Sequence, residues 1–364
     1  METVNILILG KSGVGKSSLL NYLFEENVRE TGVGRPVTAE GFFKEQKVLQ
    51  GVPITLIDSW GMEAGKSDVW FQQFAHFLRE HGAEQRVEEW IHIALYCIDA
   101  QGARIEPFEV DVLNRLREAG IEVVVALTKS GGVEEVQLAK LEQTIKRQVS
   151  EQVTIVRVNS VEMTLLTGET LHYFGKEQLL ATIRQNYFQS LRHQLPIRIK
   201  YVMKERVELV KQAMLQADSR KEAEKIATYS LEHFYETITS RVIQEELGAV
   251  YQLYNNQLNV LFGDSSVAIT DMEAFWEEVK EWTMQIVETV QKVMKGIAIV
   301  LLPLLSIPYY TAKGISKLWQ TKKKLAERYE EQADELIREA MPSIRSLIER
   351  NIDVLEEKTR GAQG

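Results

Sequence analysis

Several features are scarce in this sequence, and each absence excludes a class of protein. The 364 residues include a single cysteine, Cys97, so neither an internal disulfide framework nor a thiolate metal cluster can form. A lone cysteine inside an apolar run suits a reducing compartment. The six histidines show no spacing typical of metal ligands. No basic region precedes an apolar one near Met1, so we expect no signal peptide.

The sequence has fewer basic than acidic residues. The formal net charge of -9 at pH 7 argues against a general nucleic-acid binder, because the phosphate backbone favours a basic surface. The length, with 45% hydrophobic and 26% charged residues, fits a soluble protein with room for two domains. We therefore expect a cytoplasmic protein without nucleic acid among its partners.

The most specific motif is a glycine-rich loop between the apolar run 4–9 and a helical stretch that begins at Ser18. The loop reads Gly10, Lys11, Ser12, Gly13, Val14, Gly15, Lys16, Ser17. Glycines let successive N–H groups turn around a phosphate, and the following helix adds its positive N-terminal end. The motif predicts that the loop and Ser18 bind a nucleotide, with Lys16 on the β- and γ-phosphates and Ser17 on Mg²⁺.

Two further segments fit the same nucleotide site. Asp58 and Gly61 follow a predicted strand, where the carboxylate can hold a Mg²⁺ water and the glycine N–H can sense the γ-phosphate. Residues 32–38 lie between the two motifs and end in Thr38, whose hydroxyl would complete the Mg²⁺ shell. A plain turn at 58–61 and a simple surface loop at 32–38 are the alternatives.

Short apolar runs alternate with helical patterns up to about residue 195. The expected strands are Val4–Leu9, Val52–Ile57, Ile91–Ile98, Ile121–Leu127 and Val153–Val158, with an edge strand at Phe42–Leu49. The expected helices are Lys16–Glu26, Asp68–Glu80, Phe108–Ala119, Glu134–Val149 and Lys176–Gln194. This alternation predicts an α/β fold with a doubly wound parallel sheet and the nucleotide at the carboxyl ends of its strands.

Four aromatic residues mark the expected helix 68–80: Trp70, Phe71, Phe74 and Phe77. They either pack on the sheet or form a contact surface that changes with the nucleotide. Asp99 and Glu106, near another strand end, are expected on the surface.

After Pro196 the pattern becomes helical throughout. Apolar residues recur at helical spacing over 272–293, which predicts a long amphipathic helix, and Pro342 is expected to start or kink the last helix. We therefore expect two domains, a nucleotide-binding domain over 1–195 and a helical domain over 196–364.

One segment of the helical half, 296–312, is seventeen residues long and carries no charge. No acidic residue occurs in the surrounding window 292–324, which holds seven lysines. As a helix the segment would extend about 25 Å, short of the roughly 30 Å hydrocarbon core, and Pro303 and Pro308 interrupt it. Two interpretations remain: a buried hairpin, or a loop that dips into an anionic membrane surface and makes the protein peripheral.

The motifs in this order resemble a small GTPase domain of the translation-factor-related class. The triplet 12–14 is similar to septin-like and immunity-associated branches, and residues 35–38 resemble Era-like bacterial GTPases. The resemblance covers 1–195 and implies a Ras-like sheet, GTP or GDP with Mg²⁺ as cofactors, slow GTP hydrolysis and a conformational switch. By motif position it implies catalytic roles for Lys16, Thr38 and Gly61, and Mg²⁺ binding by Ser17, Thr38 and Asp58. The helical half resembles dynamin-like GTPases in architecture.

The chain departs from this family where the guanine base is read. The family pattern is Asn- or Thr-Lys-x-Asp, whereas this sequence has Thr128, Lys129, Ser130 and then Gly131. Thr128 and Lys129 are expected beside the nucleotide, and Asn159 with Ser160 would supply the fifth element of the family. Without the aspartate we expect weak guanine selectivity, which an aspartate at 131 would strengthen.

A second departure is Met62, where Ras-type enzymes carry the glutamine that orients water. We expect slow hydrolysis that is aided by a partner or by a homodimer, with Arg35 as a candidate donor. The alternatives are a nucleotide-gated binding module with negligible turnover and a ribosome-associated GTPase.

Overall fold

The computed structural model describes residues 3–25, 35–36, 42–49, 52–59, 67–164, 168, 170–234, 239–254 and 314–361. These residues fall into two compact units. The first unit holds the described residues up to Gln194 together with 251–254 and 355–361. The second holds 195–250 and 314–354. The domain limits expected from the sequence, 1–195 and 196–364, stay a prediction.

A seven-stranded sheet forms the centre of the first unit, in the order β2-β3-β4-β1-β5-β6-β7. The strands are β1 Val4–Leu9, β2 Arg35–Pro36, β3 Phe42–Leu49, β4 Val52–Ser59, β5 Ile93–Asp99, β6 Val123–Thr128 and β7 Thr154–Arg157. Strands β4, β1, β5, β6 and β7 pair in parallel. The α/β fold is therefore confirmed, with mixed pairing, because β3 runs antiparallel to both β2 and β4.

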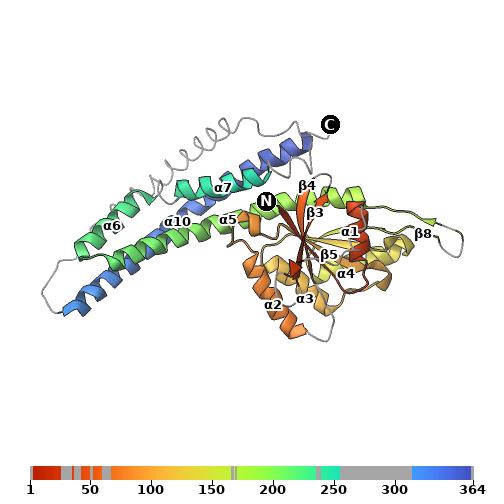
Figure 1. Ribbon diagram of the computed structural model, residues 1–364, viewed down its shortest axis with the longest axis horizontal. Coiled ribbons are helices and arrows are strands. Elements are labelled where there is room, and N and C mark those ends of the chain that lie inside the picture. Colours follow the sequence, from red (N-terminus) through yellow and green to blue (C-terminus); the bar gives the residue numbers. More distant parts are fainter. Residues whose placement is uncertain are drawn as a thin grey trace. The chain divides into compact units, whose positions relative to one another are not determined.

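Helices and a small hairpin surround the sheet, as Figure 1 shows. The helices are α1 Lys16–Phe24, α2 Ser67–Glu80, α3 Pro107–Glu118, α4 Glu135–Gln148 and the first part of α5, Lys176–Gln216. The hairpin consists of β8 Met163–Thr164 and β9 Thr170–Leu171. Expected and observed boundaries agree within a few residues for every strand that the sequence predicts and for the helices before α5. The short strands β2, β8 and β9 were not expected.

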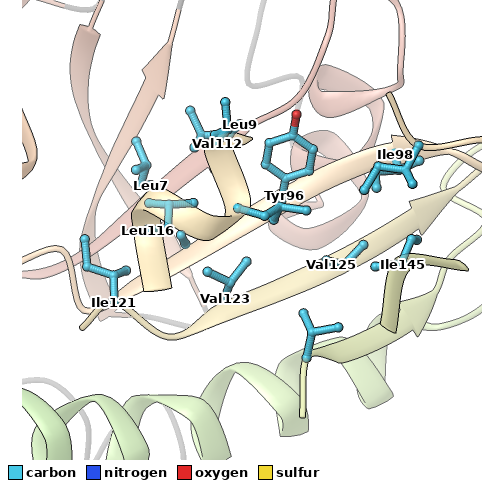
Figure 2. Packing of buried hydrophobic residues seen from close by; sticks show 14 of the residues in the cluster. Leu7, Leu9, Tyr96, Ile98, Val112, Leu116, Ile121, Val123, Val125 and Ile145 are labelled. Atoms are coloured by element: carbon cyan, nitrogen blue, oxygen red, sulfur yellow. The ribbon is translucent and has the colours of Figure 1, made fainter. Parts of the chain in front are cut away.

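The core of this unit lies between the sheet and helices α2, α3 and α4. In Figure 2, Val112 and Leu116 of α3 pack over Leu7 of β1 and Tyr96 of β5. The alternate strand residues, such as Ile8, are also fully buried, as expected for parallel strands covered on both faces.

The aromatic residues of α2 belong to this core. Trp70, Phe74 and Phe77 are at most 6% exposed. The ring of Phe77 stacks on Phe42 of β3 with 4.1 Å between centroids, and Trp70 stacks on Phe74 at 4.7 Å. The interpretation that these rings pack on the sheet is therefore confirmed.

The second unit is helical, as expected. It contains the remainder of α5 with α6 Arg220–Glu232, most of α7 Arg241–Leu253 and most of α10 Gly314–Gly361. Buried leucine, isoleucine and tyrosine side chains from these helices pack together. Polar contacts join them, including hydrogen bonds between Ser230 and Tyr329 (2.8 Å) and from Lys322 Nζ to the Ala217 carbonyl (2.6 Å).

Two prolines lie inside helices, where the sequence suggested a helix end near Pro196 and a helix start or a kink at Pro342. Helix α5 was expected to stop at Gln194 but continues through Pro196, and α10 continues through Pro342, so no helix starts there. A proline removes one backbone hydrogen bond of a helix. Buried residues on both sides of Pro196, Leu195 and Ile199, show that tertiary packing outweighs this local cost.

Several expectations lie outside the described residues. They are the amphipathic helix 272–293, the apolar segment 296–312, Thr38, Gly61 and Met62. Among the helices that the structure does describe, none combines the length and apolarity needed to cross a membrane.

One buried histidine in this fold predicts a pH dependence of stability. His92 is fully buried, its Nδ1 accepts a hydrogen bond from the Asn5 N–H (3.0 Å), and burial lowers its pKa to about 3. The unfolded chain takes up this proton near pH 6.5, so the stabilisation is complete above that pH and is lost as the pH falls toward 3. Between pH 7 and pH 5 we expect His92 to reduce the free energy of unfolding by ~2 kcal/mol.

Urea unfolding of the wild type and of His92→Gln, measured at both pH values, tests this expectation. The glutamine amide does not titrate and retains an acceptor for the Asn5 N–H. The variant should lose less stability on acidification than the wild type. Equal losses would contradict the assignment.

Candidate functional site

The glycine-rich loop connects β1 to α1, and its path depends on backbone conformations that favour glycine. Gly10, Gly13 and Gly15 have φ angles of 140°, 78° and 99°, a region that residues with side chains rarely adopt. Gly15 is also the N-cap of α1, which has no side-chain cap and no acidic residue in its first turn. The first N–H groups of the helix are therefore left for an external anion.

Lys16 places a positive charge within the loop. Its Nζ donates hydrogen bonds to the carbonyls of Gly10 (2.6 Å) and Lys11 (2.9 Å). The ammonium group thus spans the loop from the first turn of α1. An anion bound by the loop would meet this charge, as the sequence predicts for Lys16.

The second lysine of the loop has a different partner. Lys11 Nζ lies 2.7 Å from Glu106 Oε1 and 3.5 Å from Glu109 Oε2, at the start of α3. Lys11 lowers the pKa of Glu106, whereas burial raises the pKa of Glu109. Lys11 was expected among the nucleotide ligands, but the structure directs its side chain to α3 and leaves only its backbone in the loop. Glu106, expected at the surface, instead anchors the loop.

Residues at the end of β6 also form hydrogen bonds with this loop. Thr128 Oγ1 donates to the carbonyls of Val14 and Ile98, and Lys129 Nζ donates to the Gly13 carbonyl (2.8 Å). Lys129 also forms an ion pair with Asp99 (2.5 Å). Since Asp99 and Thr128 are register partners at the ends of β5 and β6, the carboxyl ends of three neighbouring strands meet at the loop.

Asp58 reaches the same edge of the sheet. It lies near the end of β4, in register with Ile8 of β1, and is half-buried. Ser17 lies in the first turn of the following helix α1. Within the part of the chain that the structure describes, no group of three or more His, Cys, Asp or Glu side chains gathers as a metal site. The expected Mg²⁺ ligands Ser17, Thr38 and Asp58 stay a prediction.

Comparison with known families agrees with this geometry. Residues 5–129 match the family model described as "50S ribosome-binding GTPase". This part of the chain, which holds the glycine-rich loop and the end of β6, is similar to P-loop GTPase domains. The resemblance inferred from the sequence motifs is therefore confirmed.

The alignments with individual relatives span less than half of each relative's length. Septin-1 of Mus musculus is 26% identical over 168 residues, which span 40% of this chain and 46% of septin-1. Cell division control protein 10 of Saccharomyces cerevisiae is 25% identical over 137 residues, spanning 31% and 42%. The aligned part is thus less than half of either protein.

Among solved structures, Toc33 from Arabidopsis thaliana in complex with Mg²⁺ and GMPPNP shares 17% identity. The superposition covers 53% of this chain and 87% of Toc33, with a TM-score of 0.37. The assignment of the GTPase domain rests on the family match and on the geometry of the loop.

On the other side of the loop, the GTPase domain carries a hairpin insertion. Strands β8 and β9 follow Ser160 and return at Phe174, which pairs with Asn159 through two backbone hydrogen bonds (3.1 and 3.2 Å). The ring of Tyr173 stacks on Tyr22 of α1 at 5.2 Å. Gly131, Asn159 and Ser160 therefore lie between the end of β6 and a hairpin held against the helix of the nucleotide loop.

Sequence reasoning missed Asp99 and Glu106 as parts of this site. Asp99 is the last residue of β5, and Glu106 is the N-cap of α3, the helix that follows β5. Their position at the carboxyl end of a strand that neighbours β1 was the available clue, because ligands bind at that edge of open α/β sheets.

Proposed function

We propose that this protein binds GTP or GDP with Mg²⁺, hydrolyses GTP slowly, and uses the nucleotide state to change its affinity for a partner. The observation that carries the proposal is the geometry of the loop 10–17. Three glycines with positive φ angles, the uncapped start of α1 and the Lys16 ammonium all belong to this one loop, a combination that favours binding of an anion. Thr128 and Lys129 hold this loop by its carbonyls.

The roles of the residues follow from that arrangement. The loop and Ser18 would hold the phosphates, with Lys16 neutralising charge that develops on the transferred group. Thr128, Lys129 and Ser160 would flank the nucleoside. Ser17, Thr38 and Asp58 would hold Mg²⁺, which supplies charge neutralisation when bound, and the Gly61 N–H would respond to the γ-phosphate.

Slow turnover is the expected kinetic behaviour. Met62 stands at the water-orienting position and cannot act as a hydrogen-bond donor for water. We expect steady-state phosphate release below about 1 s⁻¹, the lower edge of typical enzyme values, and a rate per molecule that rises with protein concentration if a second copy supplies the missing group. A rate above that limit and independent of concentration would contradict the expectation. Zero release at high protein concentration would instead favour a nucleotide-gated binding module.

A ribosome-associated role is the second candidate function. It is favoured by the description of the matching family and opposed by the net charge of -9. Co-sedimentation with ribosomal subunits in the presence of GDP or a GTP analogue separates it from a role without nucleic acid. Because rRNA contacts are salt-dependent, the assay should be made at two salt concentrations.

Reversible binding to anionic membranes is proposed from the sequence of 292–324. Seven lysines and no acidic residue surround the apolar run. Lys322 is buried and bonds the Ala217 carbonyl, and each of the other lysines that lies near an anionic surface would contribute about 1 kcal/mol. In liposome flotation we expect the full chain to float with acidic lipids and to float less as salt is raised. Leu301→Asp combined with Leu304→Asp should abolish flotation without loss of helical circular dichroism. Unfolding by the aspartates, or no flotation of the wild type in any nucleotide state, would mean that the segment is not a membrane contact.

A further inference from the structure

The space beside Gly131 is filled by the carboxamide of Asn159. A Cβ atom added to Gly131 would lie 2.9 Å from Asn159 Cγ, 3.1 Å from Nδ2 and 3.2 Å from Oδ1. An aspartate at 131 therefore has no room while Asn159 keeps its position. Asn159 occupies the place into which the family's base-reading aspartate would project.

The orientation of this carboxamide is fixed by its partners. Asn159 Nδ2 donates to the carbonyls of Val161 (2.9 Å) and His172 (2.8 Å). Only the NH₂ group can face two carbonyl oxygens, so the oxygen must lie on the other side. The backbone of Asn159 is bonded in both directions to Phe174, and the residue is only 6% exposed. The side chain is thus held rigidly by the base of the hairpin.

The oxygen of the Asn159 carboxamide is available to accept a hydrogen bond from a ligand. Asn159 Oδ1 accepts no hydrogen bond from any residue in the described part of the chain. It lies beside Gly131, two residues after the lysine that binds the Gly13 carbonyl of the phosphate loop. A nucleoside that leaves the phosphate loop along Lys129 would meet this acceptor.

We propose that Asn159 Oδ1 reads the guanine base in place of the missing aspartate, a proposal that rests on the proposed function. Guanine presents N–H donors at N1 and at its exocyclic amine, whereas adenine presents an acceptor at N1. A fixed acceptor at this point favours guanine. Because a neutral carboxamide makes weaker hydrogen bonds than a carboxylate, the preference should be smaller than that of an aspartate.

Competition binding on the full chain with Mg²⁺ tests this proposal, with GDP and ADP displacing a fluorescent GDP analogue. The wild type should bind GDP more tightly than ADP. Asn159→Ala should weaken GDP about tenfold, since a purine donor is left unpaired, and should leave ADP unchanged. Val161→Ala is the matched control, because it trims an exposed side chain on the same turn and retains the carbonyl that Nδ2 uses.

A double variant separates base reading from anchoring of the hairpin. In Gly131→Asp with Asn159→Ala, the carboxylate can enter the vacated space, so the preference for GDP should return to the wild-type value or exceed it. The single variant Gly131→Asp should fail to strengthen the preference, because Asn159 blocks the carboxylate. This corrects the expectation drawn from the sequence, in which the aspartate alone would strengthen it.

Two results would overturn the proposal: an unchanged GDP to ADP ratio in Asn159→Ala, whether or not both nucleotides bind more weakly, or no recovery in the double variant. Equal binding of GDP and ADP by the wild type would also overturn it, while leaving the phosphate site intact. Failure of the wild type to bind any nucleotide would contradict the proposed function itself.

Discussion

Lys16→Ala is expected to weaken binding of GDP and of a non-hydrolysable GTP analogue by about a hundredfold or more. The ammonium group spans the phosphate loop and would make charge-assisted hydrogen bonds to two phosphates, each contributing ~1.5–3 kcal/mol. The fold should survive, because this side chain bonds carbonyls of the loop and is not part of the apolar core. Isothermal titration with each nucleotide, accompanied by circular dichroism, measures both effects.

Lys11→Ala is the matched control for this experiment. Both lysines belong to the same loop, but the Lys11 ammonium is bound to Glu106 and Glu109 of α3. Its removal should change nucleotide affinity only a few-fold, and should destabilise the protein because Glu109 is buried and loses its counter-ion. Unchanged affinity in Lys16→Ala, or equal losses in the two variants, would contradict the assignment of the loop.

The sequence was sufficient to locate this loop because its function depends on local order. The spacing of Gly10, Gly15 and Lys16 determines where the chain turns and where the charge lies, whatever the rest of the fold does. Thr128 and Lys129, which the sequence predicts beside the nucleotide, do lie at this loop and donate hydrogen bonds to its carbonyls, and their contact with the nucleotide stays a prediction. Strand positions followed from runs of buried, β-branched residues.

Contacts between distant segments could not be predicted in this way. The ion pair of Lys129 with Asp99 requires the register of β5 and β6, and the pair of Lys11 with Glu106 requires the position of α3 against β1. The same holds for Asn159, which fills a gap that the sequence showed only as a missing side chain at Gly131. Each of these arrangements is set by tertiary packing rather than by local sequence.

At Pro196 the sequence-based prediction was wrong for the opposite reason: the local preference of proline to end a helix is outweighed by tertiary packing. A proline inside a helix costs about 3 kcal/mol in an exposed interior. Burial of Leu195 and Ile199 next to it can offset that cost, at about 1.5–3 kcal/mol for each fully buried aliphatic side chain. Helix α5 therefore continues to Gln216.

Gly10→Ala is expected to destabilise the protein strongly, by at least about 2 kcal/mol more than Gly13→Ala. Both glycines have positive φ angles, so an alanine is strained at either position. Only at Gly10 would the new Cβ also meet backbone, 2.5 Å from the Cys97 carbonyl of β5, whereas at Gly13 nothing lies within 4 Å. Because Cys97 belongs to a fully buried central strand, the carbonyl cannot move without disturbing the sheet. Urea unfolding without nucleotide separates this effect from binding, and equal free energies of unfolding for the two variants would show that the loop does not pack against β5 as described.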